Sequence, residues 1–268
     1  MFCEKTVVIT GASSGLGAAL ALTFAKLGAN LVLFSRNGEK LKKIESSCRE
    51  SGSETLVVTG DVTRPEDCKK LVSFSLSRFG TLDYLISNAG VSMWANFSEI
   101  EDISIFRKLV ETNYLGAVYC VFYALPHLKL TKAFIVSISS IQGKIGVPSH
   151  TGYVASKHAL QGFFESLRSE LSGSGVDVLT VLPHWLRGTD LRSNAFGKDG
   201  KSIGSLKRKH NKESIDLQEC CKKIINAIRK RKRELVIPAK LQLLPWLNLI
   251  NPRIVEFFVR GEIGRQGK

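Results

Sequence analysis

Short apolar runs alternate along this chain with longer amphipathic stretches. Apolar segments of strand length predict strands over 6–10, 30–34, 55–59, 83–87, 134–138, 176–182 and 235–237. The intervening segments predict helices over 18–27, 66–79, 102–125, 153–172 and 217–228. Strands that are apolar throughout and separated by helix-length segments are typical of parallel sheets covered on both faces. We therefore predict a single-domain α/β fold with a doubly wound parallel sheet.

The first predicted strand runs directly into a glycine-rich turn and then a helix. Gly11, Gly15 and Gly17 stand in the pattern T-G-x-x-x-G-x-G. Glycine permits a tight turn and a close approach of the backbone to a ligand, and the N-terminus of a helix attracts phosphate. A purely structural turn is the alternative. We interpret the segment as a dinucleotide-binding turn, with further cofactor contacts from Ser13, Ser14 and Leu16.

The end of the second predicted strand is where cofactor choice is expected, and Ser35 and Arg36 stand there. An acidic residue would bind the 2′-hydroxyl of NAD, whereas an arginine accommodates the 2′-phosphate of NADP. The sequence therefore favours NADP(H), although Arg36 is also compatible with a simple surface loop. Because ligands lie beyond the carboxyl ends of parallel strands, we expect further cofactor contacts from Asp61, Val62, Asn88, Ala89, Gly90, Pro183 and Leu186.

Tyr153 and Lys157 lie four residues apart in a predicted helix, on one helix face. A nearby ammonium group favours the phenolate and would lower the tyrosine pKa from its ordinary value of ~10. The phenol would then titrate nearer the pH at which acid–base catalysis is most effective. The same spacing also occurs in exposed helix pairs, so the other motifs must decide. One of them is Ser139-Ser140, which follows a predicted strand upstream.

Together these motifs resemble the short-chain dehydrogenase/reductase family over about residues 5–190. The resemblance implies a Rossmann-like fold and hydride transfer between a nicotinamide cofactor and a carbonyl or alcohol. It implies that Tyr153 is the acid–base group and also binds the cofactor, and that Lys157 binds the nicotinamide ribose and lowers the tyrosine pKa. It implies that Ser140 holds the substrate carbonyl and that Asn113 supports a proton relay to Lys157. A structural polar group in the helix is the alternative for Asn113.

The segment after the last core strand departs from the family pattern. His184 stands where the family has glycine, and Thr189 comes one position late. We interpret His184 as a pocket-wall residue, with a group titrating near neutral pH as the alternative. The residues expected to line the substrate pocket are mostly apolar: Ser92, Met93, Trp94, Ile141, Gln142, Val147, His150, His184, Trp185 and Leu186.

Such a pocket predicts a hydrophobic ketone or secondary alcohol as substrate. Residues 143–148 also resemble the corresponding stretch of hydroxysteroid dehydrogenases and related lipid-acting members of the family. Residues 193–212 are rich in glycine, serine and lysine and predict a mobile lid over the site. A non-catalytic NADP(H)-binding regulator or scaffold is the alternative function, but the complete set of Ser140, Tyr153 and Lys157 favours an enzyme.

The formal net charge of +14 is unevenly distributed, because residues 198–268 carry +11 and the preceding residues only +3. A basic tail without a recognition motif gives little support to nucleic-acid binding, so we expect no nucleic-acid partner. The six cysteines show no spacing typical of metal ligands, and no metal is expected. No signal-peptide pattern precedes the first predicted strand, which leads us to expect a cytoplasmic protein.

The last residues, 241–268, form an apolar extension of a domain expected to span 1–240. Residues 241–259 are apolar and aromatic, but two prolines and several polar residues argue against a membrane-spanning helix. A subunit contact in a homodimer or homotetramer, a cover for the pocket and a peripheral membrane anchor remain open. In the third case, the basic run 229–233 would join residues 241–259 in holding the protein at an anionic membrane.

Overall fold

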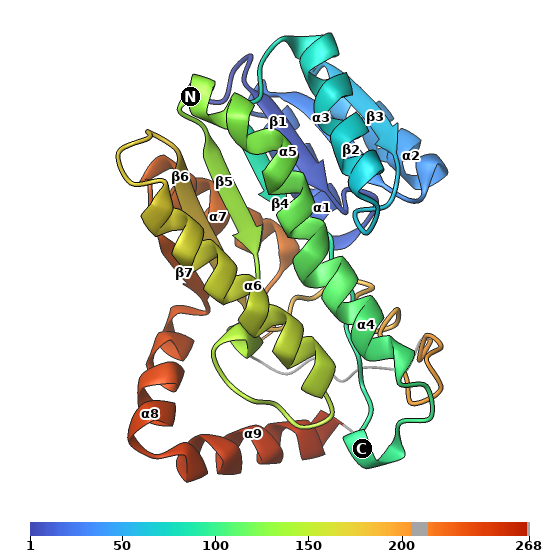
Figure 1. Cartoon of the computed structure of the whole chain (residues 1–268), viewed down its shortest axis with the longest axis vertical. Helices are drawn as coiled ribbons and strands as arrows, with labels where there is room; N and C mark the ends of the chain where they lie inside the picture. Colours follow the sequence, from blue (N-terminus) through green and yellow to red (C-terminus); the bar gives the residue numbers. More distant parts are fainter. Residues whose placement is uncertain (205–213, 267–268) are drawn as a thin grey trace.

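The computed structural model describes residues 1–204 and 214–266, and within them a seven-stranded sheet forms the centre of the protein (Figure 1). The strand order is β3-β2-β1-β4-β5-β6-β7, and all neighbouring strands are parallel. The strands are β1 (Thr6–Thr10), β2 (Asn30–Ser35), β3 (Thr55–Thr59), β4 (Tyr84–Ser87), β5 (Phe134–Ile138), β6 (Asp177–Pro183) and β7 (Glu234–Ile237). The predicted doubly wound α/β fold is confirmed, and the strand order reverses between β1 and β4.

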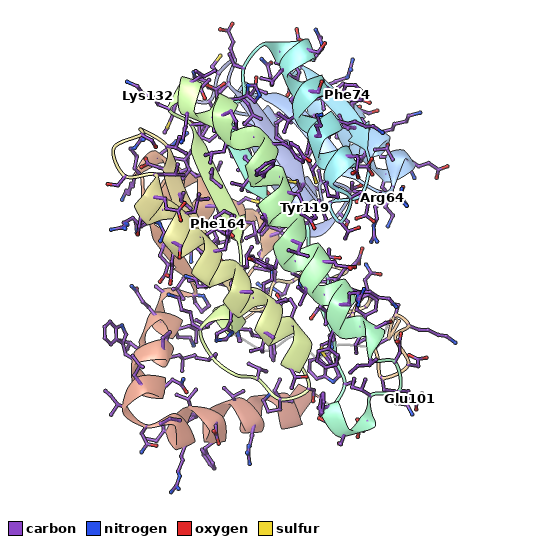
Figure 2. All side chains as sticks on the ribbon, viewed as in Figure 1. Arg64, Phe74, Glu101, Tyr119, Lys132 and Phe164 are labelled. Carbon is purple, nitrogen blue, oxygen red and sulfur yellow. The ribbon has the colours of Figure 1, made fainter. Side chains whose placement is uncertain are left out.

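Helices cover both faces of the sheet, which explains why its strands are apolar throughout. One face carries α1 (Gly15–Ala25), α2 (Gly38–Glu50) and α7 (Leu217–Arg229), whose buried side chains share a core with Val7 and Ile9. The other carries α3 (Pro65–Phe79), α5 (Gly116–Thr131) and α6 (Thr151–Glu170), which pack with Val8 and Leu85. Figure 2 shows Phe164 of α6, a fully buried side chain of this second core.

Several helices differ from the expected boundaries. The helix expected over 18–27 begins earlier, at Gly15, so it includes the last glycines of the turn. Helix α2 was not predicted, because only Leu41 and Cys48 in it are buried and its apolar periodicity is correspondingly faint. The helix expected over 102–125 is divided into α4 (Ser104–Val110), the π-helical turn Glu111–Leu115 and α5.

The predicted lid is described only as far as residue 204, and its remainder over 205–212 lies outside the described residues. Phe196 forms a parallel bridge with Met93 and an antiparallel bridge with Ser202. Its backbone N–H donates to the Ser92 carbonyl at 2.9 Å, and its carbonyl accepts from Trp94 N at 2.9 Å. Backbone hydrogen bonds therefore fix this part of the predicted lid to the segment after β4.

The C-terminal residues form the short 3₁₀ turn Ala239–Leu243 and two helices, α8 (Leu244–Ile250) and α9 (Pro252–Gln266). They follow the carboxyl end of β7, and α9 crosses the protein beneath the start of α6 (Figure 1). Val255 of α9 is buried in a cluster with Ile141 and Ile145. Within 1–204 and 214–266, the structure contains no helix with the length and apolarity that a membrane span needs.

The basic run 229–233 lies at the opposite end of the sheet from α8 and α9. Arg231 pairs with Asp177, the first residue of β6, and Arg229 lies 5.8 Å from the ring centroid of Phe2. The run therefore sits at the amino ends of the strands, whereas α8 and α9 follow a carboxyl end. The expectation that the run and residues 241–259 form one contact surface is wrong, because β7 separates them.

Candidate active site

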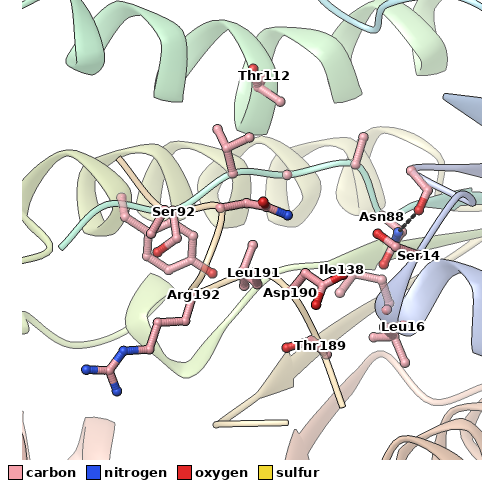
Figure 3. A pocket seen from close by; sticks show the side chains of 18 of the residues that line it. Ser14, Leu16, Asn88, Ser92, Thr112, Ile138, Thr189, Asp190, Leu191 and Arg192 are labelled. Carbon is pink, nitrogen blue, oxygen red and sulfur yellow. Dashed lines mark hydrogen bonds between the residues drawn. The ribbon is translucent and has the colours of Figure 1, made fainter. Parts of the chain in front are cut away.

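A cavity of about 810 Å³ lies at the carboxyl ends of the strands. Every predicted catalytic and cofactor-contacting residue lines it, with the exceptions of Gly17 and Asn113. Figure 3 shows that Ser14, Leu16 and Asn88 lie towards one end, whereas Ser92 and Arg192 lie towards the other. Its walls come from segments as distant in sequence as the β1–α1 turn and the segment after β6, and the parallel sheet brings these together.

The turn between β1 and α1 has the features of a phosphate site. Gly15 has a φ of +53°, in the left-handed region that glycine adopts without strain. Ser14 is the N-cap residue of α1, but its side chain makes no capping hydrogen bond. The first backbone N–H groups of α1 are therefore not satisfied by this side chain, and a ligand phosphate can accept from them. The β-carbon of Thr189 lies 3.6 Å from where a Gly15 side chain would begin, so Thr189 reaches the turn despite its shifted position.

Gly17 packs the helix against the turn and does not line the cavity. A β-carbon on Gly17 would lie 2.3 Å from the Gly11 carbonyl oxygen and 2.6 Å from Asn88 Nδ2. Asn88 Nδ2 itself donates to the carbonyl oxygens of Thr10 at 2.9 Å and Gly11 at 3.2 Å. The cofactor contact expected of Gly17 is thus replaced by close packing, whereas Gly11 and Asn88 do line the cavity.

Two basic side chains, Arg36 and Lys40, line the cavity where β2 ends, beside the β1–α1 turn; this part is called the nucleotide end below. Arg36 lines the wall with its side chain 71% exposed, and its guanidinium lies 3.9 Å from Asp61 Oδ2. Asn37 and Lys40 line the same wall and were missed from the sequence. The Asn37 side chain accepts from Lys40 N at 2.9 Å and caps α2. Recognising α2 would have revealed this pair, because a basic residue in the first turn beside Arg36 suits a phosphate.

Ser140, Tyr153 and Lys157 come together in the cavity and are all at least nine-tenths buried. Lys157 Nζ donates to the Ile138 carbonyl at 3.0 Å and lies 5.7 Å from the ring centroid of Tyr153. Ser140 Oγ accepts from Gln142 N at 3.2 Å. Three groups that can donate, accept or carry a proton, one from the segment after β5 and two from α6, therefore line the same part of the cavity.

The pKa values of Tyr153 and Lys157 differ from expectation. Burial raises the pKa of Tyr153 to about 12, and a hydrogen bond with Ser140 lowers it only in part. Burial also lowers the pKa of Lys157 to about 8. The prediction that the pKa of Tyr153 is lowered is contradicted in this structure, because removing the phenol from water raises the pKa more than the hydrogen bond with Ser140 lowers it. At neutral pH Tyr153 consequently keeps its proton.

Asn113 is buried in the π-helical turn and does not line the cavity. Its Oδ1 accepts from Val91 N at 2.8 Å, and its Nδ2 donates to the Val91 carbonyl and to Ser156 Oγ, each at 2.9 Å. Ser156 Oγ in turn donates to the Tyr153 carbonyl at 2.8 Å. Asn113 therefore joins the segment after β4 to α6. Its expected part in a proton relay to Lys157 stays a prediction.

Aromatic and cationic side chains line the far end of the cavity. Trp94 makes an edge-on contact with His150 at 4.8 Å, and the Arg192 guanidinium lies 4.0 Å from the Trp94 ring centroid. His184 stacks on Trp185 at 4.8 Å, and both line the cavity, as the pocket-wall interpretation of His184 expects.

Two of the predicted pocket residues lie elsewhere. Ile141 and Val147 do not line the cavity but belong to the cluster that supports α9. Arg192 was missed, because no motif marks the segment that follows Thr189. The substrate end is therefore less apolar than the sequence suggested.

The residues present fit a nicotinamide dinucleotide. The uncapped start of α1 and the left-handed Gly15 suit the pyrophosphate, and Arg36 with Lys40 suits a 2′-phosphate. The cavity continues from this end to Tyr153. Among the described residues, no group of three or more histidine, cysteine or carboxylate side chains is arranged to bind a metal ion.

Comparisons with known proteins agree with this geometry. The sequence profile of the family described as short chain dehydrogenase matches residues 5–199. The 11-beta-hydroxysteroid dehydrogenase-like 4A of Arabidopsis thaliana is 36% identical over 254 residues, which cover 94% of this chain and 82% of that protein. The dehydrogenase/reductase SDR family protein 7-like of Dictyostelium discoideum is 35% identical over 260 residues, covering 95% and 80% of the two chains.

Solved structures share the fold. A short chain dehydrogenase/reductase of Burkholderia phymatum in complex with NAD superposes with a TM-score of 0.83 at 24% identity, over 94% of this chain and 95% of that one. An alcohol dehydrogenase of the archaeon Thermococcus sibiricus, complexed with 5-hydroxy-NADP, gives a TM-score of 0.73 at 25% identity, over 87% and 95% of the two chains. This chain therefore belongs to the short-chain dehydrogenase/reductase family of oxidoreductases.

Proposed function

We propose that this protein is an NADP(H)-dependent reductase of hydrophobic ketones, which acts in the reverse direction on secondary alcohols. The observation that carries the proposal is the convergence of Ser140, Tyr153 and Lys157 on one buried stretch of the cavity wall. The likeness to proteins named 11-beta-hydroxysteroid dehydrogenase supports a lipophilic substrate. So do Met93, Trp94 and Trp185, which line the same cavity.

The cofactor, when bound, supplies the hydride that reduces the carbonyl carbon. Ser140 Oγ donates a hydrogen bond to the carbonyl oxygen of the substrate, and Tyr153 Oη gives this oxygen a proton as negative charge develops on it. A pKa of about 12 keeps Tyr153 protonated at neutral pH, which is the state that reduction requires. Lys157 contributes positive charge next to the phenol and holds the nicotinamide ribose. Asn113 positions α6 through Ser156.

Preference for NADP(H) over NAD(H) follows from the charge at the nucleotide end. Ser35 is short and carries no charge, so it does not repel a 2′-phosphate. Arg36 and Lys40 bring two positive charges to the same wall. Asp61 lies beside Arg36, with its Oδ2 3.9 Å from the guanidinium. The family likeness also leads us to propose a homodimer or homotetramer, which analytical ultracentrifugation would reveal.

A panel of ketones and secondary alcohols, assayed with NADPH and NADH or with their oxidised forms, tests the proposal. We expect turnover of at least one apolar ketone, faster with NADPH than with NADH. Cofactor binding without turnover of any compound would indicate a cofactor-binding regulator instead. Faster turnover with NADH would contradict the cofactor assignment and leave the reaction class intact.

A further inference from the structure

We propose that the outer face of α8 and α9 is a docking surface for an anionic lipid membrane. This outer face consists of the exposed large apolar side chains in the C-terminal helices: Leu243, Trp246, Leu247, Leu249, Ile250, Ile254, Phe257 and Phe258. The surface is separate from the catalytic cavity, since none of these residues lines it. The proposal therefore stands or falls independently of the proposed reaction.

Helix α9 carries apolar side chains both on an inner side that packs against the protein and on an adjoining outer side that is exposed. Val255 is 2% exposed, and Val255 and Val259 pack on the cluster around Ile141 and Ile145. On the other side, Phe257 is 75% exposed and lies on one face with Ile254 and Phe258. Arg253, Glu256 and Arg260 form the remaining, charged side of the helix, so its apolar stripe is wider than the single core-facing stripe of an ordinary surface helix. The inner side of α9 is covered by the protein, so its outer side calls for a separate apolar partner.

Helix α8 continues the same exposed surface. Trp246 is 66% and Ile250 is 82% exposed, and the side chains of α8 and α9 extend away from the body of the protein in Figure 2. Among the described residues, half of the large apolar side chains that are exposed belong to the sixteen positions 243–258. Scattered apolar residues are normal on protein surfaces, but a contiguous concentration of this kind marks an interaction site.

The charges around the outer face identify a lipid surface as the occupant. Positions 239–266 contain four basic residues, Lys240, Arg253, Arg260 and Arg265, and two acids, Glu256 and Glu262, and Glu256 lies 3.8 Å from Arg260. Apolar and aromatic side chains with flanking cations are typical of segments that lie in the headgroup region of a membrane. A second copy docking through the same face would bring these like charges together, because a twofold contact pairs a surface with itself.

The position of α9 suits a contact that lies flat on a membrane. The helix crosses the end of the molecule at which the strands terminate (Figure 1). No helix in the described parts of the chain is suited to spanning a bilayer, so attachment through this face would be peripheral. The basic run 229–233 lies at the other end of the sheet and cannot join the same contact.

Flotation of the full-length protein with lipid vesicles tests the proposal. Vesicles of phosphatidylcholine alone are compared with vesicles that also contain phosphatidylserine, each at low and at high salt. We expect flotation with the anionic vesicles at low salt and less at high salt. Arg253→Gln with Arg260→Gln should weaken binding about 25-fold, because each charge near an anionic surface contributes about 5-fold. The matched control, Lys230→Gln with Lys232→Gln, removes the same charge from the opposite end and should bind as the unchanged protein does.

A second pair of double variants tests the contribution of the apolar side chains to membrane binding. Phe257→Ser with Phe258→Ser should abolish flotation, whereas Phe74→Ser with Leu130→Ser, which removes exposed apolar side chains on α3 and α5, should leave it unchanged. All four positions are exposed, so we expect every variant to fold, with an unchanged circular dichroism spectrum. The proposal is overturned if the full-length protein stays with the unbound fraction at low salt. It is also overturned if Phe257→Ser with Phe258→Ser instead converts an oligomer into monomers without affecting flotation, which would indicate a second copy as the occupant.

Discussion

Replacing Arg36 by alanine is expected to weaken the binding of NADPH and to leave the binding of NADH nearly unchanged. Arg36 lines the nucleotide end of the cavity, where its guanidinium lies near Asp61 and the start of α2. A 2′-phosphate carries the charge that the guanidinium recognises, whereas a 2′-hydroxyl does not. The substitution therefore distinguishes a phosphate contact from a surface residue that merely lies near the cavity.

The exposure of Arg36 sets the size of this effect. Hydrogen bonds to charged groups contribute about 1.5–3 kcal/mol, and screening by water favours the lower end. The Arg36 side chain is 71% exposed, so we expect a loss of about 1.5 kcal/mol, or about tenfold in the dissociation constant of NADPH. Lys40 retains part of the positive charge on the same wall, and Arg36→Ala with Lys40→Ala should weaken NADPH further.

Fluorescence titration of each protein with NADPH and NADH measures the two dissociation constants. The matched control is Arg64→Ala, because Arg64 is an exposed arginine just before α3 and does not line the cavity. We expect this variant to bind both cofactors as the unchanged protein does. Equal loss of affinity for NADPH and NADH in Arg36→Ala, or no loss for either, would refute the assignment of Arg36 to the 2′-phosphate.

Three further substitutions test the packing and the electrostatics of the site. Gly17→Ala places a β-carbon 2.3 Å from the Gly11 carbonyl oxygen and should lower the free energy of unfolding by about 1–3 kcal/mol. The control is Gly162→Ala in α6, whose β-carbon meets no atom within 4 Å and should not destabilise the protein. Urea denaturation compares the two variants. The fold disfavours the charged form of Lys157, whose pKa is lowered to about 8. The free energy of unfolding of the unchanged protein, relative to that of Lys157→Met, should therefore rise as pH increases from about 8 to 10.5. A difference that is constant with pH would contradict the burial of this ammonium. Asn113→Ala leaves the backbone N–H of Val91 without its acceptor and should cost about 1–3 kcal/mol in thermal or urea denaturation, while unchanged stability would show that these hydrogen bonds are dispensable.

The sequence predicted the parallel sheet well because both faces of that sheet are buried. Strands β1 and β5 are buried along their whole length. Such strands produce continuous apolar runs that can be recognised in the sequence alone. Most of the motif residues line one cavity, since turns that follow parallel strands meet at one edge, although Gly17 and Asn113 do not. Amphipathic surface elements were harder to predict. Helix α2 buries only two side chains, so its sequence resembles a polar loop.

Features that depend on distant contacts could not be predicted from the sequence. Ile141 and Val147 appeared to be pocket residues because they follow Ser140, but α9 packs against them and draws them out of the cavity wall. The tyrosine pKa was predicted in the wrong direction, because spacing reveals the neighbouring Lys157 but not the depth at which both are buried. The separation of the basic run from α8 and α9 likewise depends on the parallel direction of β7.

Tyr153→Phe tests the central claim, that this protein transfers hydride with Tyr153 as its proton donor. The substitution removes only the phenolic hydroxyl and keeps the ring, so cofactor affinity and folding should be retained. Turnover of a ketone identified with NADPH is predicted to fall by about 10²–10⁴-fold, which is the usual effect of losing a general acid. Near-normal turnover by Tyr153→Phe, measured with NADPH binding intact, would contradict the claim.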